Sequence, residues 1–216
     1  MADPLLQTFQ LKHLHLKNRI ITTSHEPAYN EGGFPKDRYI AYHLERARGG
    51  IAMTMTAGSA VVSKDSPPSF DNIHAYKDEV VPWIKKLTDT IHDHDCKIMI
   101  QLTHLGRRTS WSKGDWLPSL SSGKHREPAH KAFPKVMESW DIKRIIKEYG
   151  DAAERMKEGG MDGVELEGQG HLIGQFLSPL TNELNTEYGG SLENRLRFTI
   201  EVLSDIRNKV GQDFIV

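Results

Sequence analysis

Short apolar runs and stretches of helical periodicity alternate along the chain. Each run has the length of a strand and is followed by apolar positions spaced three or four residues apart. The expected strands are residues 19–24, 51–56, 97–103 and 163–166, and the expected helices are residues 36–48, 81–94, 139–159 and 191–211. This alternation predicts an α/β fold built on a parallel sheet.

The expected helix ends follow from capping and breaking residues. Gly49 and Gly50 stop the first helix, Ser139 is the expected N-cap of the third, and Gly159 and Gly160 stop it. The last helix is expected to bury one apolar stripe, which consists of Leu192, Leu196, Leu203, Ile206 and Val210.

Polar and small residues gather at the end of the fourth expected strand. Glu167, Gly168, Gln169, Gly170 and His171 follow directly after it. Because α/β folds place their chemistry at the carboxyl ends of parallel strands, a functional site is expected there.

Composition excludes several classes of function. The 216 residues are 38% hydrophobic and 26% charged, and 28 Lys and Arg face 29 Asp and Glu, which gives a net charge of −1. A chain without a basic excess is not expected to bind nucleic acid. The longest apolar-looking run, residues 51–62, contains Thr, Gly and Ser and is far shorter than a membrane span. We therefore expect no membrane partner and a small-molecule substrate.

The single cysteine, Cys96, limits the metal and redox chemistry of these residues. One thiol forms neither an internal disulfide nor a four-thiolate iron–sulfur site nor a Cys-rich zinc site. No signal-peptide core follows Met1. These features together predict a cytoplasmic enzyme that uses an organic cofactor.

Several motifs occur in the order in which one enzyme family carries them. They are Leu16-Lys17-Asn18-Arg19-Ile20, Arg46-Ala47-Arg48-Gly49-Gly50, Gln101-Leu102-Thr103-His104-Leu105-Gly106-Arg107, Gln175-Phe176-Leu177, Asn182, Glu187-Tyr188-Gly189-Gly190-Ser191-Leu192-Glu193-Asn194-Arg195 and Phe198. Over nearly its whole length the chain resembles the old yellow enzyme family of FMN-dependent (β/α)8-barrel oxidoreductases. Residues 170–179 are more similar to the N-methyl amine and betaine demethylases, relatives of trimethylamine dehydrogenase, than to the enone reductases.

The resemblance implies a (β/α)8 TIM barrel, of which this chain is the N-terminal half to two-thirds. A complete barrel needs about 250 residues, and residues 213–216 read as the opening of a fifth strand. We expect residues 1–216 to be the N-terminal part of a single FMN-binding barrel domain, with a hairpin at residues 9–16 closing its floor. A 4Fe-4S cluster would belong only to a missing C-terminal part. The resemblance leaves NAD(P)H, an electron-transfer partner and a homo-oligomer open.

The resemblance also implies which residues contact FMN. Ser24 and His25, at the end of the first strand, and Ala57 and Gly58, at the end of the second, are the expected contacts. The covalent-flavin relatives carry a cysteine at about the position of Glu26, so the flavin here is expected to be non-covalent. The simpler alternatives are that His25 is a loop histidine bonded locally and that Gly58 is a turn glycine.

Gln101 is a flavin-contact candidate on its own chemistry as well. It interrupts an otherwise apolar strand, and a buried amide without partners costs about 1–3 kcal/mol. The pyrimidine edge of a flavin offers both a donor and an acceptor, and the family uses a glutamine at this position for that edge.

The fourth strand end departs from the pattern of the enone reductases. Those enzymes carry V-E-I-H-G-A-(H or N)-G-Y-L there, with two donors for a substrate oxygen and a Tyr that donates a proton. This chain reads Val164-Glu165-Leu166-Glu167-Gly168-Gln169-Gly170-His171-Leu172, one residue shorter. Glu167 replaces the first His or His171 replaces the Tyr, depending on the alignment, and neither alignment retains the pair of donors.

A carboxylate in place of a donor reverses the charge that the site prefers. Glu167 stabilises a cationic substrate and opposes the negative charge that develops on an enone. The resemblance then implies hydride transfer from an N-methyl carbon to flavin N5, followed by release of formaldehyde. His171 is expected to orient the substrate or take a proton from it, and His104 to contact a substrate carboxylate. The alternative for Glu167 is a structural ion pair with Arg107.

Three other interpretations stay open at this point. The nearest is an NAD(P)H-dependent reductase of α,β-unsaturated carbonyl compounds on the same scaffold. The second is a non-catalytic fragment without the flavin phosphate site. The third, a metal-dependent hydrolase suggested by the 11 histidines, is disfavoured because His13, His15, His92 and His94 fall on the expected hairpin and helix, and no metal site is expected. In the loop at residues 109–138, Trp111 and Trp116 are candidates for a lid over a methylated ammonium.

Overall fold

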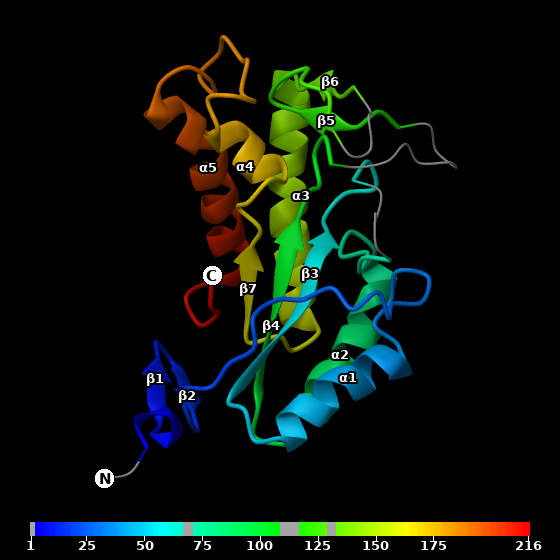
Figure 1. Ribbon diagram of the computed structural model, residues 1–216, viewed down its shortest axis with the longest axis vertical. Helices are drawn as coiled ribbons and strands as arrows, with labels where there is room; N and C mark the ends of the chain where they lie inside the picture. The colour runs from blue at the N-terminus through cyan, green and yellow to red at the C-terminus, as the bar shows by residue number, and fades with distance from the viewer. Residues whose placement is uncertain (1–2, 67–70, 109–116, 129–132) are drawn as a thin grey trace.

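A parallel sheet of three strands lies at the centre of the structure (Figure 1). The computed structural model describes residues 3–66, 71–108, 117–128 and 133–216. The strands are β3 (Met53–Val61), β4 (Lys97–Thr103) and β7 (Gly163–Leu166), in the order β3-β4-β7. Single parallel bridges from Ile21 to Met53 and from Gly163 to Ile215 add one position at each edge. The predicted parallel α/β arrangement is therefore confirmed, but the strand expected at residues 19–24 is wrong, since only Ile21 pairs with the sheet.

Four long helices pack against one another in chain order on one face of this sheet. They are α1 (Asp37–Arg48), α2 (Val81–His92), α3 (Ser139–Glu158) and α5 (Leu192–Val210). Helix α1 packs on α2, α2 on α3 and α3 on α5. The large apolar core lies between these helices and the strand residues Ile98, Ile100, Leu102 and Val164.

Shorter elements complete the described chain. They are the 3-10 helices η1 (Pro4–Leu6) and η2 (Asp78–Val80), the helix α4 (Leu172–Leu177) and the strands β1 (Phe9–Leu11), β2 (Leu14–Leu16), β5 (Leu120–Ser121) and β6 (Lys135–Val136). Within the described ranges, no helix is long and apolar enough to cross a membrane.

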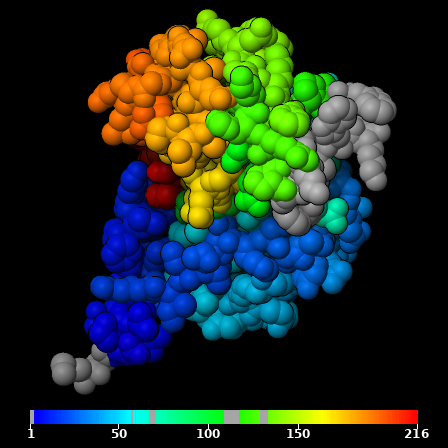
Figure 2. Space-filling view, turned by 45° about the horizontal axis from the view of Figure 1, so that its top comes forward, coloured from blue at the N-terminus to red at the C-terminus, as the bar shows by residue number. Residues whose placement is uncertain are grey.

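The other face of the sheet carries a second, smaller core at its lower end. Met53, Met55 and Met99 pack there with Ile215 and with Leu14 and Leu16 of the predicted hairpin. Gly163 permits this packing, because a Cβ at its position would lie 2.6 Å from Ile215 Cβ. In the space-filling view the end of the chain lies between the N-terminal segment and the segment around β7 (Figure 2).

Strand β3 is longer than predicted. The expected strand ended at Thr56, whereas β3 continues to Val61 with a register shift between Thr56 and Ala60. A bulge of this kind resumes the pairing with β4 after a local kink. The small residues of this segment gave no periodic signal for the extension.

Two helix predictions also need correction, and the sequence pattern missed one helix. Glu138, not Ser139, is the N-cap of α3, where it forms a capping box with Asp141. The buried face of α5 differs from the predicted one. Phe198 and Val202 are buried with Ile206 and Val210, while Leu192 and Leu203 are exposed. Helix α4 was not predicted, because six residues are too few for a periodic signal.

Candidate functional site at the strand ends

Two layers of polar side chains lie above the methionines, on the face of the sheet that the long helices do not cover. The lower layer consists of Ser24, Gln101 and Glu165, and the upper layer of Thr103 and His171. Side chains on a strand alternate between its two faces, so Gln101 and Thr103 of β4 point the same way as Met99. Glu165 pairs in register with Gln101, and Glu167 follows it two residues later. The two layers therefore lie one above the other toward the carboxyl ends of the strands.

The lower layer joins three neighbouring strand positions. The Gln101 side-chain amide donates to Ser24 Oγ at 2.8 Å and to Glu165 Oε2 at 2.9 Å, and the Ser24 hydroxyl donates to Glu165 Oε2 at 3.1 Å. Gln101 is only 7% exposed. Both of its hydrogen bonds use the amide nitrogen, so its carbonyl oxygen has no donor among the described residues.

The upper layer is centred on Thr103 and His171. Thr103 Oγ1 lies 2.9 Å from His171 Nδ1, and the hydroxyl of the buried Tyr149 accepts a hydrogen bond from the neighbouring His104 backbone N–H at 2.8 Å. Burial raises the pKa of Tyr149, and the charge of Glu167 contributes to this shift. Glu167 is therefore close enough to act on the same group of side chains.

Glu167 is half-buried at the end of β7. Its Oε1 accepts a hydrogen bond from the Gln169 backbone at 2.6 Å. It forms no ion pair with any residue in the described ranges, and Arg107 instead donates to the His125 carbonyl at 3.3 Å. The carboxylate thus remains at the strand exit without a protein counter-ion there.

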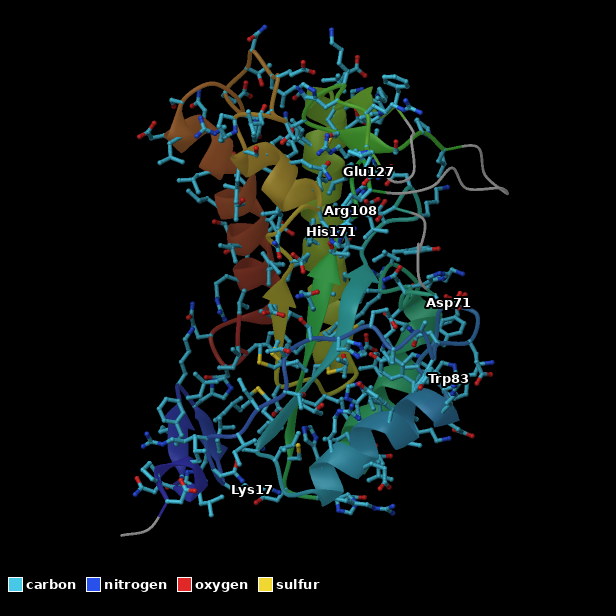
Figure 3. The ribbon with its side chains drawn as sticks, viewed as in Figure 1. Lys17, Asp71, Trp83, Arg108, Glu127 and His171 are labelled. Atoms are coloured by element: carbon cyan, nitrogen blue, oxygen red, sulfur yellow. The ribbon has the colours of Figure 1, made fainter. Side chains whose placement is uncertain are left out.

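His171 is neutral near pH 7 in this environment. Burial first, and then the charge of Arg108, lower its pKa to about 4. Figure 3 shows the Arg108 and His171 side chains near each other beyond the end of β4. The guanidinium lies 3.6 Å from the position that a Cβ on Gly170 would take.

His104 lies inside the structure, with an exposed fraction of 0%. The Gly106 N–H donates to its Nδ1 at 3.0 Å, so the ring proton is on Nε2, which donates to Asp65 Oδ1 at 3.0 Å. Burial alone would raise the pKa of Asp65, but the bonds from His104 and Ser63 and the charge of Arg144 hold it well below its usual value. His104 therefore anchors the loop after β3.

Gln175, on α4, connects three loops at this end of the sheet. Its Nε2 donates to the carbonyl oxygens of Leu105 at 3.2 Å and Gly170 at 3.0 Å. Its Oε1 accepts from the Arg107 backbone at 3.1 Å and from Ser121 Oγ at 2.9 Å. All four hydrogen-bonding positions of this buried amide are used.

His25 lies apart from the two layers. Its Nδ1 is 3.0 Å from the Tyr42 hydroxyl of α1, and it lines a cavity of about 380 Å³ beside that helix with Thr23 and Arg46. Ser24 and His25 are consecutive on an extended segment, so they face opposite sides of the sheet. The structure thus joins Ser24 to Gln101 and places His25 toward α1.

Ala57 and Gly58 lie in the bulge of β3. A Cβ on Gly58 would be 3.0 Å from the Glu26 backbone nitrogen, so the glycine allows a close approach of chain to chain. Glu26 has one buried carboxylate oxygen without a hydrogen-bond donor among the described residues. Burial raises the pKa of Glu26 to about 7.

Sequence reasoning missed Glu165, Thr103, Arg108 and Gln175. The alternation of polar residues at 101 and 103, and again at 165 and 167, is the signal that could have identified the first two. Trp111 and Trp116 lie outside the described residues. Within the described ranges, no three His, Cys, Asp or Glu side chains are grouped to hold a metal.

Residues 4–216 match the NADH:flavin oxidoreductase / NADH oxidase family. A relative from Rhizobium meliloti (strain 1021), "Probable N-methylproline demethylase", is 68% identical over 99% of this chain and 32% of its own length. The "Multifunctional alkene reductase/demethylase OYE" of Caballeronia cordobensis is 48% identical over 100% of this chain and 32% of its own. The chain spans about a third of the length of these curated relatives.

Among solved structures, morphinone reductase in complex with tetrahydroNAD superimposes with a TM-score of 0.92. The match covers 99% of this chain and 63% of that one at 23% sequence identity. At this identity the likeness concerns the fold.

Proposed function

The chain belongs to the NADH:flavin oxidoreductase / NADH oxidase family, and from this membership we propose that it is the N-terminal part of an FMN-dependent enzyme that oxidatively demethylates an N-methylated amine or amino acid. The observation that carries the proposal is the Glu167 carboxylate at the exit of β7, which has no cationic partner among the described residues. The 68% identity to a probable N-methylproline demethylase supports the same choice of substrate.

The proposal includes a complete (β/α)8 barrel in the full-length protein. Apolar surface at both edges of the sheet supports it. Ile21 lines the cavity beside α1, and Ile200, Leu203 and Val216 line another of about 420 Å³ beside α5. Further strand–helix units packed at these edges would bury both surfaces.

The lower polar layer fits the pyrimidine edge of a non-covalently bound flavin. The free carbonyl oxygen of Gln101 can accept a flavin N–H, while Ser24 and Glu165 hold the Gln101 amide in place. Gly58 and Ala57 follow on the neighbouring strand. Bound FMN would supply the acceptor for the hydride of an N-methyl C–H bond.

The protein's own residues then select and orient the amine. Glu167 stabilises the positive charge on a methylated nitrogen, most strongly when the substrate excludes water. The neutral His171 ring has Nδ1 on Thr103, which leaves Nε2 to accept a proton from a substrate N–H. His104 acts as a positioning residue through Asp65. Water added to the oxidised N-methyl carbon releases formaldehyde and the demethylated amine.

Reduction of activated alkenes is the second candidate. The 48% identity to a multifunctional alkene reductase/demethylase favours keeping it. Against it stands Glu167, because a carboxylate opposes the negative charge that an enone develops as it accepts hydride. In either case the electrons pass between FMN and NAD(P)H or an electron-transfer partner.

Anaerobic mixing distinguishes these functions. The full-length protein, loaded with FMN, is mixed with N-methylproline or N,N-dimethylglycine while the flavin absorbance is followed. Bleaching with release of formaldehyde supports demethylation. An oxidised flavin with every amine, together with turnover of NADPH and cyclohexenone, contradicts it and supports the alkene reductase.

A further inference from the structure

The geometry points to Arg108 as the group that binds a carboxylate of the substrate, which makes the substrate class N-methylated amino acids rather than simple N-methyl amines. This inference rests on the proposed demethylase function and names the substrate class of the same site. His104, which the sequence suggests for the carboxylate contact, does not fill this role. That ring is buried and both of its nitrogens are used within the protein.

Arg108 has the position that this role needs. It is exposed just beyond the end of β4, and its guanidinium lies beside Gly170, the residue that precedes His171 (Figure 3). Its charge acts on His171. A substrate that reaches His171 therefore lies within the field of Arg108.

Gln175 fixes the two loops that carry this pair. One amide side chain receives the Arg107 N–H and donates to the Gly170 carbonyl. Gly106, with a φ of +60°, completes the turn, since a Cβ there would lie 2.3 Å from Gln175 Oε1. Gln175 thus holds in place the two loops that carry the Arg108 guanidinium and the His171 imidazole. Less conformational entropy is therefore lost when the substrate binds.

The charges around His171 match a zwitterion. Glu167 lies at the exit of β7, four residues before His171 in the sequence, and Arg108, which follows β4, lies beside Gly170. An amine without a carboxylate interacts with Glu167 but offers no group that Arg108 can bind. An amino acid places its ammonium toward the first and its carboxylate toward the second, where a guanidinium can bind both oxygens.

The test compares substrates that differ only in the carboxylate. Steady-state kinetics of the FMN-loaded full-length protein are measured with N-methylproline and with N-methylpyrrolidine, in the wild type, Arg108→Gln and Arg108→Lys. For Arg108→Gln we expect KM for N-methylproline to rise about 10- to 100-fold, with kcat and the N-methylpyrrolidine constants nearly unchanged. For Arg108→Lys we expect a KM for N-methylproline between those of the wild type and Arg108→Gln, because lysine keeps the charge but loses the bidentate geometry.

Lys124→Gln is the matched control, since it removes an exposed positive charge from a nearby loop. It should leave both substrates unaffected. The inference is overturned if Arg108→Gln lowers kcat/KM equally for N-methylproline and N-methylpyrrolidine, or if it leaves KM for N-methylproline unchanged.

A second readout separates this inference from the proposed function. L-proline is titrated into the oxidised protein and its Kd is read from the perturbation of flavin absorbance, without turnover. Weaker binding of L-proline by Arg108→Gln supports the carboxylate site even where no amine is oxidised. Equal binding by the variant and the wild type, or no binding of L-proline by the wild type, overturns it.

Discussion

At the scale of single residues, the charge at the end of β7 decides which substrate the site favours. Glu167 accepts one backbone hydrogen bond and has no cationic partner in the described part of the chain. A half-buried carboxylate in this state lowers the energy of a nearby cation and raises that of a nearby anion. The same residue therefore favours a methylated amine and disfavours the transition state of enone reduction.

Glu167→Gln tests this role directly, because it keeps the shape and removes the charge. We expect kcat/KM for N-methylproline to fall about 10- to 100-fold, while the affinity for FMN stays the same. Stopped-flow flavin reduction and a flavin titration measure the two quantities. Glu154→Gln, on the exposed side of α3, serves as the control. An unchanged rate with the amine would show that Glu167 does not face the substrate.

The sequence identified some residues of the site better than others. Gln101 could be found because a lone amide in an apolar strand needs a partner, and its contacts with Ser24 and Glu165 now meet that need. Arg108 could not, because an arginine in a polar loop resembles any solvated arginine. Its proposed role in substrate binding depends on its closeness to Gly170 in the fold, and Gly170 is 62 positions away in the sequence.

At the scale of elements, the short helix α4 holds the loops of the site together. Replacing Gln175 by Met would leave the Leu105 and Gly170 carbonyls and the Arg107 N–H without their partner. We expect the free energy of unfolding to fall by about 2–4 kcal/mol, as measured by urea denaturation. Gln169→Met makes the same change at an exposed position and should have little effect. Equal stability of the two variants would exclude the bracing role.

His43 of α1, which contacts Thr54 of β3, should make the free energy of unfolding depend on pH. Burial first, and then the charges of Arg46 and His25, lower the pKa of His43 to about 3 from 6.5. Below pH 6.5 the unfolded chain takes up a proton that the folded chain does not. The stability from this residue is therefore complete above pH 6.5 and is lost as the pH falls, by at most about 1.4 kcal/mol per pH unit.

His43→Gln should flatten this dependence. Urea unfolding of the wild type and the variant at about pH 7.5, 6 and 5 gives the difference that belongs to His43. His15→Gln changes an exposed histidine and should leave the profile unaltered. Parallel profiles for wild type and His43→Gln would contradict the burial argument.

Element types could be predicted more reliably than element faces. Strands β4 and β7 and the four long helices gave clear periodic signals. The face of α5 did not, because Leu192, Ile200 and Leu203 form a second apolar stripe beside the buried one. Each of two apolar stripes on a helix can pack against a different neighbour. The sequence pattern alone does not tell which stripe of α5 packs on α3.

At the scale of the whole molecule, the family resemblance drawn from the motifs is confirmed. The proposed complete barrel makes a prediction about the second stripe of α5. Ile200 is 56% exposed and Leu203 is 39% exposed in this chain. In the full-length protein a following unit should cover them, so Ile200→Glu should lower stability by about 1–3 kcal/mol. Urea-induced loss of the bound-flavin signal measures this.

Leu180→Glu is the control for that experiment, because Leu180 is 80% exposed and lies in the segment between α4 and α5. It should unfold at the wild-type urea concentration. If Ile200→Glu also behaves like the wild type, the edge of the sheet beside α5 stays open in the full-length protein.

The central claim is that the protein breaks an N-methyl C–H bond, and deuterium in that methyl group tests it most directly. Anaerobic flavin reduction is compared for N-methylproline and its N-trideuteromethyl form, and the formaldehyde is analysed by mass. We predict slower reduction with the labelled substrate and formaldehyde that retains two deuterium atoms. Equal rates together with a product that keeps the whole labelled methyl group would contradict the demethylase account.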